Sequence, residues 1–170
     1  MKTISLFLIL LAAGLIIMSC NNSTDSDNDS NPTEGEITVS GDYQASFNYV
    51  LGVYSGNSGE YSGVVATQSL DFFSDEFGFG LYSDGHAVFT KSIGDWQWLG
   101  YTATNLDASY DISDTCKPRL TVNHVVLYYD SSYKSFEPWV FNPINLDSTK
   151  SVTVNGDMST DYRKLGICDN

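Results

Sequence analysis

Basic residues are scarce in this chain: eight Lys and Arg stand against 21 Asp and Glu, which gives a formal net charge of −13 at pH 7. A protein that binds nucleic acid gains much of its affinity by neutralising phosphates with Lys and Arg, and basic segments are likewise drawn to anionic lipid. The composition therefore argues against a nucleic-acid partner and against direct electrostatic adsorption to a membrane.

Long apolar runs are also missing after the first twenty residues. A helix needs about 20 apolar residues to span a bilayer, and no later run approaches that length. Residues 4–18 are uncharged, rich in Leu and Ile, and preceded by Lys2. This run is short for a membrane span but has the length of the hydrophobic region of a signal peptide, so we expect the protein to be exported.

The end of this run resembles the signal of bacterial lipoproteins. In that family an aliphatic residue, a tolerant position and a small residue precede a Cys, and here the four are Ile17, Met18, Ser19 and Cys20. The resemblance implies cleavage after residue 19 and a lipid on Cys20. Two or three acyl chains on one Cys would meet the requirement for stable anchoring. The alternative is an ordinary secretory signal cut near Ser19, with Cys20 incidental.

The next segment, residues 21–36, has no aliphatic or aromatic residue and five acidic ones. Such a stretch cannot bury enough apolar surface to offset its ordering entropy. We therefore expect a signal peptide at 1–19, a lipidated Cys with a disordered acidic tether at 20–36, and one globular domain at 37–170. Acidic residues soon after a lipidated Cys also resemble the surface-export signals of some Gram-negative lipoproteins, which implies the outer membrane and its outer face.

The acids of the tether also match part of a calcium loop. Asp25, Asp27, Asp29 and Glu36 fall at positions 1, 3, 5 and 12 of an EF-hand loop, but Ser30 replaces the glycine that makes its sharp turn. A solvated tether is the better interpretation, and we expect neither a metal nor another cofactor.

Cysteine is limited to three residues. If Cys20 carries lipid, Cys116 and Cys168 remain, an even number in an oxidising compartment. We predict a disulfide between them, closing a loop of 51 intervening residues. The alternative is two free buried thiols.

Helical periodicity is nearly absent, whereas short runs of Tyr, Phe, Val and Thr alternate with period 2. Asp84-Gly85 is typical of a type I′ hairpin turn, and the strands around it predict a meander from residue 77 to residue 102. In the run 119–129 we place Leu120, Val122, His124, Val126 and Tyr128 on one face. These patterns predict an all-β domain of eight to ten antiparallel strands, as a single β-sandwich or, alternatively, a closed lipocalin-like barrel.

Catalytic motifs are absent. We expect His86 to be exposed after its turn and His124 to be a core residue, and no Ser has the context of a nucleophile elbow. An envelope glycan hydrolase would need two nearby carboxylates; the candidates are Asp71, Asp75, Glu76, Asp95 and Asp111.

Aromatic residues are abundant, at 14% of the chain. Trp96 and Trp98 lie two apart on one expected strand and therefore face the same way, and Trp139 lies near a second strand. Exposed rings of this kind stack on sugars, whereas buried rings would belong to the core.

These observations favour a lipid-anchored protein of the bacterial cell envelope whose β domain is non-enzymatic and binds a glycan, a protein or a small ligand. An envelope glycan hydrolase and a structural component of an envelope assembly are the alternatives.

Overall fold

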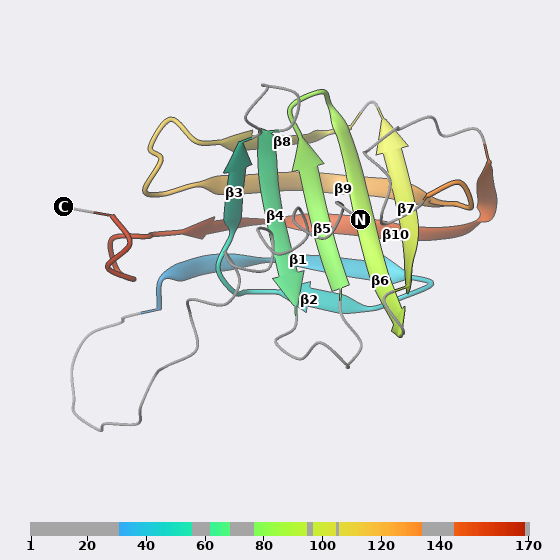
Figure 1. Cartoon of the computed structure of the whole chain (residues 1–170), viewed down its shortest axis with the longest axis horizontal. Coiled ribbons are helices and arrows are strands. Elements are labelled where there is room, and N and C mark those ends of the chain that lie inside the picture. The colour runs from blue at the N-terminus through green and yellow to red at the C-terminus, as the bar shows by residue number, and fades with distance from the viewer. Residues whose placement is uncertain are drawn as a thin grey trace, which may run out of the picture.

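The computed structural model describes residues 31–55, 62–68, 77–94, 97–104, 106–133 and 145–168 (Figure 1). Within these residues every regular element is a β-strand. The prediction of an all-β, antiparallel chain is confirmed. The ten strands are β1 Thr33–Gly41, β2 Ala45–Phe47, β3 Gly52–Ser55, β4 Ser62–Gln68, β5 Phe77–Tyr82, β6 His86–Gly94, β7 Gln97–Thr104, β8 Ala108–Asp111, β9 Arg119–Asp130 and β10 Leu146–Thr160.

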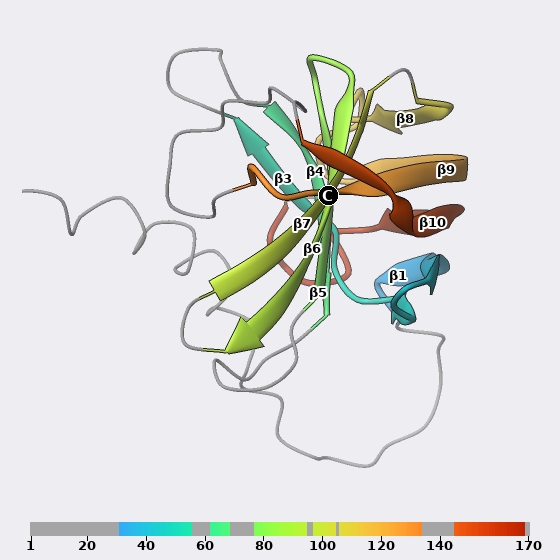
Figure 2. The same ribbon diagram turned by 90° about the vertical axis from the view of Figure 1, so that its right-hand side faces the viewer.

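All ten strands belong to one sheet, in the order β2-β1-β10-β9-β7-β6-β5-β4-β3, and β8 pairs with β9 beside β7. Every pair of neighbouring strands is antiparallel. In Figure 1 the strands β4 to β7 cross those of β1, β9 and β10, and Figure 2 shows the same two groups from the side. β2 contacts β4, near the other end of the sheet. The sheet is therefore curled into a half-barrel.

The core fills the concave side of this sheet. Its members come from both crossing groups of strands, and they occupy alternate positions because successive side chains of a strand point to opposite faces. Each fully buried apolar side chain contributes about 1.5–3 kcal/mol relative to exposure. The largest fully buried side chains are Phe47, Phe79, Phe89, Ile37, Leu51, Leu120, Leu127, Met158, Val64, Val122, Val152 and Val154.

β9 departs from the predicted alternation in its middle. Between the pairs Val154–Val125 and Gly156–Val122, β9 carries one more residue than β10. This extra residue is a β-bulge, and His124 adopts a left-handed backbone there, with φ of 51°. Beyond the bulge Val125 and Leu127 point into the core. The prediction that His124, Val126 and Tyr128 share the apolar face is therefore wrong.

The hairpin between β5 and β6 is present, but its turn differs from the predicted type. Among the described residues His124 is the single non-glycine with positive φ, so Asp84 does not adopt the conformation of a type I′ turn. Gly85 has φ of 85°, and its amide donates to the carbonyl of Tyr82 at 3.0 Å. The loop is thus a turn closed by a left-handed glycine, and the meander β5-β6-β7 that it begins is confirmed.

The first strand begins before residue 37. β1 starts at Thr33, which is buried and whose hydroxyl lies 3.1 Å from that of Thr160. Residues 33–36, which the composition assigned to the tether, therefore belong to the sheet. Glu36 accepts a hydrogen bond from the Ser46 hydroxyl at 2.7 Å, so this carboxylate is engaged within the domain.

Candidate functional site

The predicted anchor and stacking residues lie mostly outside the described part of the chain. Cys20, Trp96 and Trp139 are among the residues that the structure does not describe. The backbone of Trp98 belongs to β7 and pairs with Ser92 of β6, but its side chain is not described. The lipid site and the Trp platform therefore stay predictions.

The predicted disulfide is confirmed. Cys116 and Cys168 are bonded, with their Cα atoms 5.9 Å apart. The bond ties the C-terminal turn to the loop between β8 and β9. Around it the Tyr162 amide donates to the Cys116 carbonyl at 2.8 Å, and Arg163 Nη2 donates to both carboxylate oxygens of Asp114 at 2.9 Å.

Both histidines lie in environments opposite to the predicted ones. His86 is 4% exposed, stacks on Tyr82 at 4.3 Å between ring centroids, and contacts the Asp84 carboxylate through Nδ1. Burial lowers the pKa of His86, and Asp84 opposes that shift. His124 is exposed, because the bulge turns it out of the core. Its amide donates to Asn155 Oδ1 at 3.2 Å.

A gap in the β-ladder lies beside this bulge. β7 pairs with β9 at Tyr101–Tyr129 and Thr102–Tyr128, and β8 resumes the pairing at Ala108–Val122. Ala108 lies six positions after Thr102, and Val122 lies six positions before Tyr128. β7 and β8 therefore follow the same register along β9. Between these paired stretches, the described residues Ala103, Thr104, Leu106 and Asp107 have no ladder partner on β9. The Asn123 amide closes the far end of the gap by donating to the Asp107 carbonyl at 2.8 Å.

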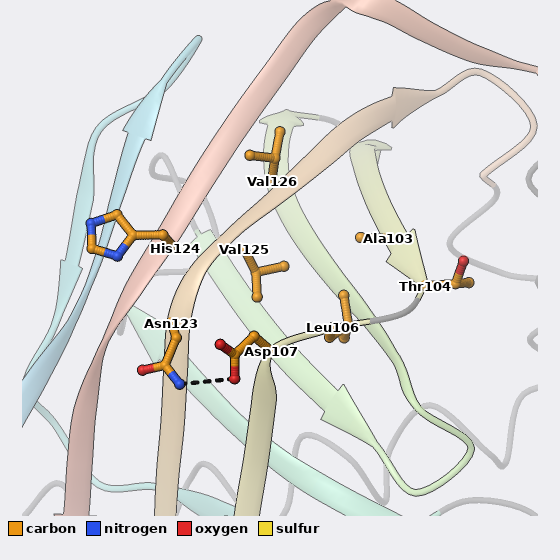
Figure 3. Close-up of a pocket in the computed structure, with 8 residues that line it drawn as sticks. All are labelled: Ala103, Thr104, Leu106, Asp107, Asn123, His124, Val125 and Val126. Carbon is orange, nitrogen blue, oxygen red and sulfur yellow. Dashed lines mark hydrogen bonds between the residues drawn. The ribbon is translucent and has the colours of Figure 1, made fainter.

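The gap holds a pocket of about 250 Å³ (Figure 3). The buried Val125 and the half-buried Ala103 and Leu106 form its apolar floor. Its exposed rim is formed by the remaining lining residues, Thr104, Asp107, Asn123, His124 and Val126. Figure 3 shows the side chains of Leu106 and Val125 on the same side of β9, whereas the His124 ring points away from them. The pocket thus combines an apolar floor with a polar rim, and it is smaller and more polar than the usual small-molecule site of about 300–1,000 Å³.

Two polar side chains of the rim are hydrogen-bonded to each other. Asn123 Nδ2 donates to Asp107 Oδ1 at 2.9 Å (Figure 3). The carboxylate keeps further lone pairs, and the amide keeps one N–H and its carbonyl oxygen. The pair therefore presents a donor and several acceptors side by side. Sequence reasoning missed both residues; the weak signal was the Asn-His pair inside a strand, since Asn is depleted in strands.

A second cluster, of aromatic side chains, lies inside the curl of the sheet. The Tyr101 ring contacts those of Tyr43, Phe89 and Tyr129 at centroid distances of 5.9, 5.9 and 5.7 Å. Burial, helped by Tyr43 and Asp42, raises the pKa of Tyr101, so its hydroxyl is neutral at physiological pH. The rings pack on one another, and we interpret the cluster as core.

Among the hydrolase candidates the structure describes Asp111, while Asp71, Asp75, Glu76 and Asp95 lie outside the described residues. The Ser113 amide donates to Asp111 Oδ1 at 2.8 Å, and this bond lowers the pKa of the Asp111 carboxyl. A general acid for glycoside cleavage needs a raised pKa instead, so Asp111 is unsuited to that role.

Neither a cluster of metal ligands nor a membrane-spanning helix occurs among the described residues. No three His, Cys, Asp or Glu side chains there gather closely enough to hold a metal ion. The same part of the chain contains no helix with the length and apolar character to cross a membrane.

The chain matches no protein-family model, no curated protein and no solved structure. The features of the chain that bear on its function are therefore the pocket, the disulfide and the signal-like first twenty residues.

Proposed function

We propose that this is a lipid-anchored protein of the bacterial cell envelope whose β domain binds a glycan, with one sugar unit seated in the gap between β7 and β9. The observation that carries the proposal is the Asp107–Asn123 pair beside an apolar floor. A sugar ring offers hydroxyls that both donate and accept, together with an apolar C–H face. The pair matches the hydroxyls, and Leu106 and Val125 match the C–H face.

The proposed location of the protein in the cell envelope rests on separate observations. The lipoprotein-like signal ending at Cys20 implies the anchor, and the acidic residues after it favour the outer membrane and its outer face. The Cys116–Cys168 disulfide agrees with an oxidising compartment. Removal of residues 1–19 takes away Lys2 and leaves seven basic against 21 acidic residues, a formal charge of −14. Such a charge keeps an exposed envelope domain soluble.

The ligand site is tested with the full chain purified in detergent. Saturation-transfer NMR against glucose, N-acetylglucosamine and galactose should detect binding of at least one sugar. Asp107→Ala should remove that signal, because it takes away the carboxylate acceptors of the pocket and the hydrogen-bond partner of Asn123. Asp111→Ala is the matched control, an exposed carboxylate on the same stretch of chain but outside the pocket. Absence of a binding signal with every sugar, or an equal loss of that signal in both variants, would refute the site.

The anchor is tested independently. Cys20→Ala should lose membrane association and the mass of the lipid. If this variant still fractionates with the membrane, the anchor is refuted, but the proposed ligand site is not affected. A stoichiometric protein partner in pull-downs, without sugar binding, would favour a role in an envelope assembly instead.

A further inference from the structure

The outer face of β9 and β10 carries a strip of uncharged side chains. Leu127 and Val125 of β9 point into the core, so the residues between and beyond them point outward. Val126 is 40% exposed and Tyr128 is 36% exposed. The strip, as defined by register and burial, consists of Val126 and Tyr128 of β9, Ser151, Thr153 and Asn155 of β10, and Thr38 and Ser40 of β1.

The members of the strip lie side by side across three strands. Tyr128 pairs with Ser151 and Val126 pairs with Thr153, so each exposed β9 side chain has a hydroxyl beside it. On the other side of β10, Thr153 pairs with Ser40. Directly paired residues have Cβ atoms about 4.5–5.5 Å apart. The strip is thus a continuous surface that is apolar along β9 and bears hydroxyls along β10 and β1.

Charged residues flank the strip but do not enter it. At one end Arg119 Nη2 pairs with Asp157 Oδ2 at 2.8 Å. At the other end lie Asp147 and Lys150. The strip itself therefore contains no charged side chain, although the chain has 21 acidic residues. A neutral partner that binds here removes no charged group from water. An ionic partner would lose hydration of its own charge and would meet no opposite charge within the strip.

The strip is continuous with the pocket. Val126 lines the pocket and belongs to the strip. Tyr128 lies two residues further along β9 on the same face, a distance of about 6.8 Å at the usual rise of a strand. A chain of linked sugars that places one unit in the pocket would therefore bring its next unit toward the Tyr128 ring.

We propose that the strip binds a linear, uncharged polysaccharide that runs along β9 and β10, with one unit in the gap and the next unit against Tyr128. This inference rests on the proposed function, and it adds the class of glycan. A protein partner is less suited to this surface, because the centres of protein interfaces are rich in aromatic residues, Met and Arg, whereas the strip offers one aromatic ring among hydroxyls.

Calorimetric titration of the full chain in detergent tests the inference. The probes are glucose and N-acetylglucosamine, their linear hexamers cellohexaose and chitohexaose, and the anionic hexamer of galacturonic acid. We expect a neutral hexamer to bind at least about tenfold more tightly than its own monomer, and the anionic hexamer to bind more weakly. Tyr128→Ala should weaken hexamer binding about tenfold, the equivalent of about 1.4 kcal/mol, and leave monomer binding unchanged.

Tyr128→Phe keeps the ring and should retain hexamer binding. Tyr49→Ala is the matched control, because Tyr49 is 53% exposed and lies outside the strip. If monomer and hexamer bind equally, or if Tyr128→Ala has no effect on the hexamer, the strip is refuted and the sugar site in the gap survives. If no monomer and no hexamer binds, both proposals are overturned.

Discussion

Replacing Cys116 and Cys168 together by Ser removes the bond that holds the C-terminal turn against the loop between β8 and β9. The two residues are 52 positions apart. In the chain-entropy model a cross-link over such a loop stabilises the folded state by about 4 kcal/mol, by restricting the unfolded chain. For a domain of this size the same change lowers Tm by roughly 10–20 °C.

The folded state of this variant keeps most of its local contacts. The Tyr162 amide still reaches the residue 116 carbonyl, and Thr160 N donates to the Pro118 carbonyl at 3.1 Å. The Arg163–Asp114 pair also remains. We therefore expect the variant to fold to the same sheet, with its stability loss arising in the unfolded state.

Urea unfolding followed by circular dichroism measures this loss. The folded spectra of the double variant and of the native protein should coincide, and wild-type protein unfolded in the presence of a reductant should reproduce the midpoint of the variant. A loss below about 1 kcal/mol would refute the entropic reasoning. A variant that does not fold at all would show that the bond does more than restrict the unfolded chain.

Three further predictions concern the core, a close contact and an ion pair. Leu127→Ala empties a fully buried site and should cost about 2–5 kcal/mol in urea unfolding; a loss under about 1 kcal/mol would contradict its place in the core. Gly100→Ala should cost about 1–3 kcal/mol, because a Cβ there would overlap the Tyr133 ring; a neutral effect would show that Tyr133 does not pack on β7. Hydrogen bonds from Arg119 lower the pKa of the Asp157 carboxyl. The stability from this pair is therefore present above the ordinary carboxyl pKa and is lost as pH falls through the folded value. The difference in urea midpoint between native protein and Asp157→Asn should be constant above about pH 5 and should shrink from there to about pH 3; a difference that stays constant over the lower range would refute this.

Local features of the sequence predicted the strands and the hairpin. Phe77, Phe79 and Leu81 alternate with Gly78 and Gly80, and the following Asp-Gly marks the turn. This part of the meander can therefore be predicted from the local sequence alone. The Cys116–Cys168 pairing followed from the small number of cysteines. The prediction that His86 is exposed was wrong, because the local sequence does not reveal that the Tyr82 ring covers the His86 ring.

The pocket depends on contacts between distant segments and could not be predicted in this way. The extra residue of β9 exists only relative to β10, and it reverses which of Val125 and Val126 faces the core. The gap in turn depends on the register that β7 and β8 share along β9. No local pattern near Asp107 carries that information, so the Asp107–Asn123 pair was missed.

Amide chemical-shift mapping of the full chain during titration with glucose or N-acetylglucosamine tests the central claim most directly. We predict that the largest shifts fall at Thr104, Asp107, Asn123 and Val126, which line the gap, and that Asp107→Ala abolishes them. Shifts confined to another part of the sheet, or shifts that survive Asp107→Ala unchanged, would contradict a sugar site between β7 and β9.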